Sequence, residues 1–120
     1  MESNFFFYIA QGTAITIAVT LVALPFGLII GLALALVNTY AGKWPRRASA
    51  VYSLVMRGIP PIALLFILYF LLSGRWLNLS PFWAGSISLG IVSSAYQMEI
   101  LRGALASVGS GQMTAARAVG

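Results

Sequence analysis

Residues 13–37 read TAITIAVTLVALPFGLIIGLALALV, an apolar run of 25 residues that no charged side chain interrupts. At a rise of about 1.5 Å per residue, a helix of this length crosses the roughly 30 Å hydrocarbon core of a bilayer. A secretory signal peptide fits poorly, because the run is too long and the residues before it carry Glu2 but no basic side chain. The run therefore predicts a transmembrane helix.

The composition of the whole chain supports this class. Apolar residues make up 60% of the 120 positions and charged residues only 8%, too few polar groups to cover a soluble globule. The absence of Cys and His excludes disulfide frameworks, thiol nucleophiles and zinc fingers, and the two acids, Glu2 and Glu99, do not suffice for a paired-carboxylate hydrolase. We therefore expect an all-α integral membrane protein that is not an enzyme, with no catalytic residue and no metal site.

Two further apolar runs complete a prediction of three transmembrane helices. They cover residues 48–72 and residues 82–108. The Pro60-Pro61 pair in the second run and Pro25 in the first predict bends, because each proline removes a backbone hydrogen bond and clashes with the preceding turn. A short, alanine-rich helix is expected after the third run, at residues 110–120.

The basic residues between the runs predict the orientation of the chain. The loop at residues 38–47 holds Lys43, Arg46 and Arg47, whereas the loop at residues 73–81 holds only Arg75. The net charge of +5 is thus spread between apolar runs, a pattern that indicates membrane topology and not binding of nucleic acid. Since basic loops stay in the cytoplasm, we expect the amino terminus outside and the tail helix inside, with Tyr40 and Trp44 at the inner interface.

Small and hydroxyl-bearing residues indicate how the helices pack. In the first run small residues recur every four positions, at Ala23, Gly27, Gly31 and Ala35. The third run has the same spacing at Ser86, Gly90 and Ser94. Such spacing predicts grooves that let another helix approach closely. Thr13, Thr16 and Thr20 form a second face, whose hydroxyls either bond back to their own helix or line a translocation path.

Three charged residues fall inside the predicted spans. Counted at 1.5 Å per residue, Arg57 and Glu99 lie about 25 Å from the outer interface, and Arg102 lies one turn deeper. A charge at this depth is costly unless it is paired or reaches the interface. One reading is an Arg57–Glu99–Arg102 network between the second and third spans; the other is a gate or a site for a charged solute. Both predict a basic partner for Glu99.

Several segments resemble the permease subunit of a binding-protein-dependent ABC importer, in its polar amino-acid branch. RGIPPIALLFILYF (residues 57–70) resembles the Arg-Gly-Thr-Pro helix start of that branch, with Ile59 in place of Thr. SAYQMEILRGALASVGSGQ (residues 94–112) resembles its Ser-Ala-Tyr, Glu, Arg-Gly and Gly-Gln signature, and residues 12–36 fit its first helix. TAARAVG (residues 114–120) resembles the coupling motif, with Thr114 in place of the usual Glu.

The resemblance implies a function and a set of partners. It implies that two permease subunits form the solute path, that an extracytoplasmic binding protein delivers the solute, and that a cytoplasmic ABC ATPase binds the ATP, so no cofactor is expected in this chain. The tail helix would couple to that ATPase through Gln112, Thr114, Ala115, Ala116 and Gly120. Because the family continues with further membrane helices after this Gly, we expect a partial transmembrane domain, an amino-terminal fragment of a permease in the inner membrane.

Two other functions compete with this reading. A small proton-coupled multidrug exporter has a similar size and a membrane Glu, but it needs four spans and a carboxylate near the middle of the membrane. A non-transporting assembly protein would use the same spans only to pack against a partner.

Overall fold

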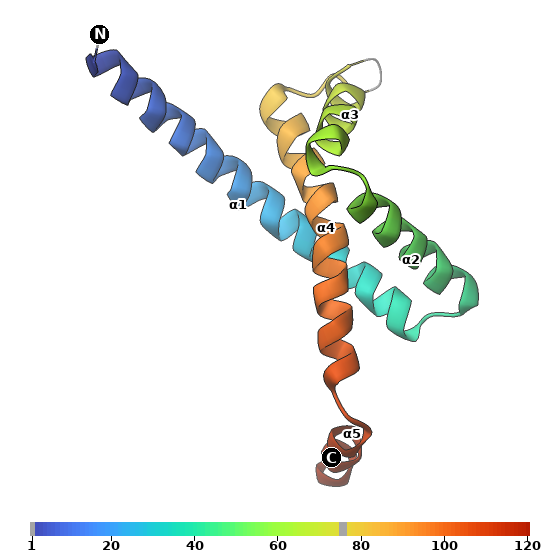
Figure 1. Cartoon of the computed structure of the whole chain (residues 1–120). Helices are drawn as coiled ribbons and strands as arrows, with labels where there is room; N and C mark the ends of the chain where they lie inside the picture. The colour runs from blue at the N-terminus through green and yellow to red at the C-terminus, as the bar shows by residue number, and fades with distance from the viewer. Residues whose placement is uncertain (1, 75–76) are drawn as a thin grey trace.

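The computed structural model describes residues 2–74 and 77–120, and these residues are helical with short connections (Figure 1). In chain order the helices are α1 (Glu2–Tyr40), α2 (Lys43–Gly58), α3 (Pro61–Ser73), α4 (Pro81–Ser107) and α5 (Ser110–Val119). The predicted all-α class is confirmed for this part of the chain. Arg75 and Trp76, including the single basic residue expected in the second loop, lie outside the described residues.

The packing of α1 against α4 forms the core of the molecule, and the two helices cross each other in Figure 1. All the small residues predicted to form grooves are buried: Ala23, Gly27, Gly31 and Ala35 on α1, and Ser86, Gly90 and Ser94 on α4. A Cβ atom on Gly31 would lie 3.0 Å from the carbonyl oxygen of Ser94. The predicted grooves are therefore confirmed, and each helix occupies the groove of the other.

The predicted span at residues 48–72 is divided into α2 and α3, and the helix direction turns by 109° between them. The break lies at Ile59 (φ −87°, ψ 137°) and Pro60 (φ −53°, ψ 131°), which both leave the helical region. Each of these residues precedes a proline, and the proline ring disfavours helical backbone in the residue before it. The bend predicted at the Pro60-Pro61 pair is thus confirmed, whereas α1 continues through Pro25 without a break.

Within the described residues, length and composition identify α1 as one helix able to cross a membrane. The bent α2–α3 pair meets the same criteria only when its two helices are taken together. Helix α4 has 27 residues but is richer in polar side chains, and it does not meet them. The count of three spans therefore stays a prediction.

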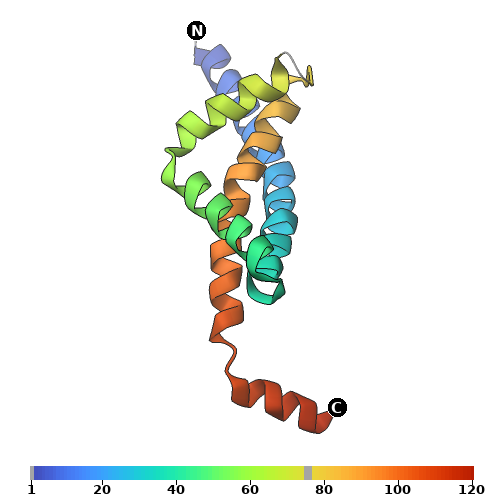
Figure 2. The ribbon, with the colours of Figure 1, turned by 90° about the vertical axis from the view of Figure 1, so that its right-hand side faces the viewer.

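Helix α5 projects away from the other helices and has no buried residue (Figure 2). Val108 and Gly109 have extended backbone and join it to the end of α4. Gly109 precedes the first residue of α5, whereas Gly111 lies inside that helix. Gly109 has φ −70° and ψ 153°, values open to any residue, so the turn requires neither glycine. The short helix predicted at residues 110–120 is present.

Candidate functional site

A polar cluster joins α2 to α4. Ser53 is fully buried on α2, and its hydroxyl donates a 2.8 Å hydrogen bond to Oε1 of Glu99 on α4. The Nε of Arg57, one turn later on α2, donates to the Ser53 hydroxyl oxygen at 3.1 Å. The Ser53 hydroxyl therefore links the Arg57 guanidinium to the Glu99 carboxylate by two hydrogen bonds.

Glu99 also forms ion pairs with two arginines. Arg102 donates from Nη2 at 2.7 Å and from Nε at 3.1 Å to the same carboxylate oxygen, and Arg57 Nη2 lies 3.7 Å from the other oxygen. The three side chains are 44%, 37% and 22% exposed for Arg102, Arg57 and Glu99. The predicted network is confirmed, and it carries a net charge of +1 at a partly exposed position between two helices.

Tyr52 provides a second polar link that the sequence interpretation missed. Its hydroxyl lies 2.7 Å from the Ser94 hydroxyl and donates to the carbonyl oxygen of Ile91 at 3.2 Å. The signal was present in the sequence, because Ser49, Ser53 and Arg57 recur every four residues beside Tyr52. Four-residue spacing puts such side chains on one face of a helix, and here that polar face is turned toward α4.

The threonines of α1 bond to their own helix. Thr13, Thr16 and Thr20 each donate to the carbonyl oxygen four residues earlier, at 2.8, 2.9 and 2.8 Å. This is the first of the two readings given for that face. All three are exposed, so the face remains open to lipid, solute or another helix.

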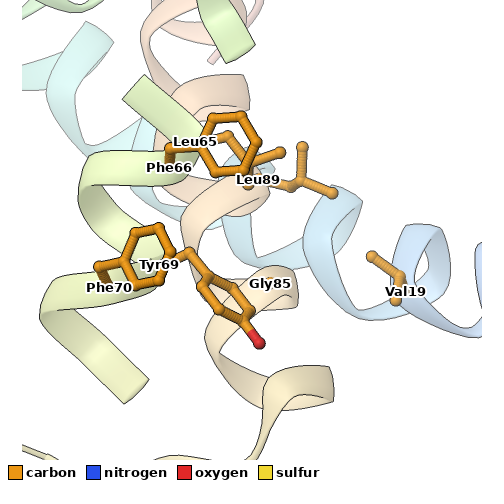
Figure 3. A pocket seen from close by; sticks show the side chains of 7 residues that line it. All are labelled: Val19, Leu65, Phe66, Tyr69, Phe70, Gly85 and Leu89. Atoms are coloured by element: carbon orange, nitrogen blue, oxygen red, sulfur yellow. The ribbon is translucent and has the colours of Figure 1, made fainter. Parts of the chain in front are cut away.

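An apolar pocket of about 320 Å³ opens between three helices (Figure 3). Its lining comes from Val19 of α1, from Leu65, Phe66, Tyr69 and Phe70 of α3, and from Gly85 and Leu89 of α4. This pocket could not be predicted from the sequence, because it depends on how α3 folds back after the 109° bend. Its lining suits an apolar group and offers nothing to a charged one.

The residues predicted to contact an ATPase all lie on α5 or at its end. Gln112, Thr114, Ala115 and Ala116 are exposed, and the Thr114 hydroxyl donates to the carbonyl oxygen of Ser110 at 3.0 Å. Gly120 follows the helix with φ +97°, a backbone conformation that favours glycine. These residues are therefore separate from the Arg57–Glu99–Arg102 cluster, which lies between α2 and α4.

Comparison with known proteins identifies relatives of the chain. The family described as "Binding-protein-dependent transport system inner membrane component" matches residues 23–120. A permease protein of Rickettsia conorii, assigned by its name to a glutamine transport system, is 34% identical over 94% of this chain and 52% of its own length. The octopine transport system permease protein OccQ of Agrobacterium tumefaciens is 30% identical over 92% of this chain and 52% of its own length.

A solved structure agrees with these sequence matches. The crystal structure of an amino acid ABC transporter with histidines matches with a TM-score of 0.72 and 32% identity, over 96% of this chain and 57% of the other. The chain thus spans about half the length of the relatives that it matches. The family predicted from the sequence motifs is confirmed, and the comparisons give no support to the exporter alternative.

Proposed function

This chain belongs to the family of binding-protein-dependent transport system inner membrane components, and from that premise we propose that it forms part of the solute path of an ATP-driven importer. In this proposal a second permease subunit completes the path and an extracytoplasmic binding protein delivers the solute. A cytoplasmic ABC ATPase binds and hydrolyses the ATP, and this chain transmits the motion of that ATPase to the path.

The exposure of α5 carries the proposal of coupling. No residue of this helix is buried, and two extended residues join it to α4. A ten-residue helix is only marginally stable in water by itself, so a partner surface is expected to hold it. Ala115 and Ala116 let such a surface approach closely, and Thr114 brings no carboxylate, so docking rests on shape more than on charge.

The proposed solutes are polar amino acids. The names of the relatives refer to glutamine and octopine transport, and the similar structure is that of an amino acid transporter. Arg57, Glu99 and Arg102 are candidates for a gate or part of the solute path, because they are partly exposed and carry both signs of charge. Guanidinium groups pair well with the carboxylate that every amino acid carries.

The proposed orientation has the amino terminus outside and α5 in the cytoplasm. It is supported by Lys43, Arg46 and Arg47 at the start of α2, next to the short connection from α1. In this orientation α5 meets an ATPase on the side where ATP is available.

The coupling proposal is tested in the full permease, assembled with its ATPase and binding protein in proteoliposomes. Ala115→Arg puts a long charged side chain on the docking surface. We expect it to lower the uptake of a radiolabelled amino-acid mixture about tenfold, which requires a loss of only about 1.4 kcal/mol in docking. Hydrolysis of ATP should continue without stimulation by the binding protein.

The matched control is Ala10→Arg, the same substitution at an exposed residue of α1 that precedes the first predicted span. This variant should take up the amino-acid mixture within about twofold of the unsubstituted permease, which corresponds to a change of about 0.4 kcal/mol in docking free energy. Normal uptake and normal stimulation in the Ala115→Arg variant would show that α5 is not the coupling element. Ala115 is preferred to Gly120 because any side chain at Gly120 would also strain the backbone.

A further inference from the structure

Helix α2 has its polar face buried and its apolar face exposed. Ser49 and Ser53 are 3% and 0% exposed, whereas Val51 and Leu54 are 59% and 67% exposed. A surface helix in water shows the opposite arrangement, with its apolar stripe toward the core. The outward face of α2 is therefore suited to contact with an apolar environment.

The same outward face begins with positive charge. Trp44, Arg47, Val51 and Leu54 are spaced by three or four residues, which places them along one side of the helix. The Arg47 guanidinium lies 5.7 Å from the centre of the Trp44 ring, within the range of a cation–π contact. The exposed Lys43 adds a second charge in the same helical turn.

The third basic residue of this turn has a structural role. Arg46 Nη2 donates to the carbonyl oxygens of Thr39 and Ala41, at 3.4 and 3.5 Å, at the end of α1. Asn38 Nδ2 donates to the Arg46 carbonyl oxygen and to the Ser49 hydroxyl, both at 3.2 Å. These bonds fix the turn, so that Lys43 and Arg47 are presented from a defined position.

No carboxylate balances these charges in the part of the chain that the structure describes. Glu99 is paired with Arg57 and Arg102, and Glu2 lies at the opposite end of α1 from the turn that holds Lys43. In the described residues neither Lys43 nor Arg47 forms an ion pair. Both side chains are exposed and are therefore available to an anion from outside the described residues.

We propose that the outward face of α2 binds an anionic phospholipid. Lys43 and Arg47 contact its phosphate, Trp44 lies at the level of the headgroup, and an acyl chain follows Val51 and Leu54. The distance from Arg47 to Leu54 along the helix is about 10 Å, which leads from the headgroup into the hydrocarbon. The order of charge, then tryptophan, then aliphatic side chains is the order of polarity in one leaflet of a bilayer.

A phospholipid explains the face better than a protein partner does. A protein that covered α2 would need an acidic patch and an apolar patch at this spacing, whereas every anionic phospholipid carries both. The proposal depends on the membership of this chain in an inner membrane family and not on which solute is carried.

The test uses the fluorescence of Trp44 in the full permease, with Trp76, Trp83 and every other tryptophan replaced by Phe. The permease is placed in phosphatidylcholine nanodiscs that contain increasing fractions of dibrominated phosphatidylglycerol or dibrominated phosphatidylcholine. Bromine quenches tryptophan only at close contact. We expect phosphatidylglycerol to quench Trp44 at a several-fold lower fraction than phosphatidylcholine does, and this preference should weaken in high salt.

Matched variants separate a site from general charge attraction. Arg47→Gln and Lys43→Gln should each lower the preference for phosphatidylglycerol roughly fivefold, the factor expected for one basic side chain near an anionic lipid surface. Arg117→Gln removes one exposed charge from α5 and should leave the preference unchanged. The preference is a ratio within each variant, so a change in Trp44 emission itself does not affect it.

Three outcomes would overturn the proposal. Equal quenching by the two lipids would show that the site does not select an anion. An equal effect of Arg47→Gln and Arg117→Gln would show that only net charge acts. Protection of Trp44 from both lipids would show that a protein covers this face instead.

Discussion

Gly27 of α1 lies directly against the backbone of Gly90 on α4, so that a Cβ atom added to Gly27 would be 2.9 Å from the Gly90 carbonyl oxygen. The same atom would lie 3.0 Å from Cβ of Ser93. Because the first of these neighbours is backbone, it cannot rotate away. The two helices are thus closer than any side chain at this point allows, and they are held together by contact between their backbones.

The first prediction compares two glycines of α1. Gly27→Ala should lower the free energy of unfolding by about 1–3 kcal/mol, because α1 and α4 must move apart. Gly12→Ala should instead be neutral or raise it by up to about 1 kcal/mol, because alanine favours helix and no atom lies within 4 Å of its Cβ. Thermal unfolding of the purified permease in detergent measures both. A similar effect of the two substitutions would contradict the close contact.

The second prediction concerns the buried hydroxyl that links α2 to α4. Ser53→Ala should lower the free energy of unfolding by about 1.5 kcal/mol, the low end of the range for a hydrogen bond to a charged group. The low end applies because the Glu99 side chain is 22% exposed. In a Glu99→Gln background the same change should cost clearly less, because the charged acceptor is gone. A double-mutant cycle of unfolding free energies gives the difference.

The matched control for this cycle is Ser107→Ala. The Ser107 hydroxyl donates only to the Ala104 carbonyl oxygen within α4, so its loss should be nearly neutral and independent of Glu99. Equal costs for Ser53→Ala in the two backgrounds would show that Ser53 and Glu99 are not coupled.

The third prediction concerns the bend between α2 and α3. Spin labels at Ala48 and Phe70, both exposed, should lie about 19 Å apart if the helix direction turns by 109° between α2 and α3. Replacing Pro60 and Pro61 by Ala lets the helix continue, and the separation should then approach about 33 Å. Pulsed electron paramagnetic resonance measures both distances.

Pro25→Ala serves as the control for this measurement, because α1 is already continuous at that residue. It should leave the distance between the labels unchanged. A short distance that persists without Pro60 and Pro61 would mean that packing against α4, and not the prolines, sets the bend.

The fourth prediction concerns the orientation in the membrane. The chain contains no cysteine, so single cysteines can be introduced at Asn78 and at Gly42. An impermeant thiol reagent added outside should label the Asn78→Cys variant and should not label the Gly42→Cys variant in intact cells. Lysis should make both reactive, which controls for burial. Labelling of Gly42→Cys alone from outside would reverse the proposed topology.

Features that follow from the spacing and type of residues along the chain could be predicted from the sequence. The four-residue recurrence from Ala23 to Ala35 marks a face that only another helix can fill, and α4 fills it. The pairing of Glu99 with Arg57 and Arg102 followed from the cost of leaving a carboxylate alone among apolar residues.

Features that depend on how separate segments meet could not be predicted in this way. A serine such as Ser53 can equally bond to its own helix, as Ser88 does, so its role toward Glu99 needed the position of α4. The proline pair predicted a bend but not its size, because a kink within one span and a turn of 109° share the same local sequence. The apolar pocket beside Phe66 depends on that angle.

The isolation of α5 has a mechanical consequence. The buried residues of α4 end at Met98, and the bond from Ser53 to Glu99 is the next link to α2. Beyond Glu99 the rest of α4, about 12 Å of helix, has no buried residue, whereas the roughly 27 Å back to Pro81 contains all the buried residues of the helix. A sideways force on α5 therefore displaces this free segment first, and it reaches the packed part of the helix at Met98 and at the hydrogen bond from Ser53 to Glu99.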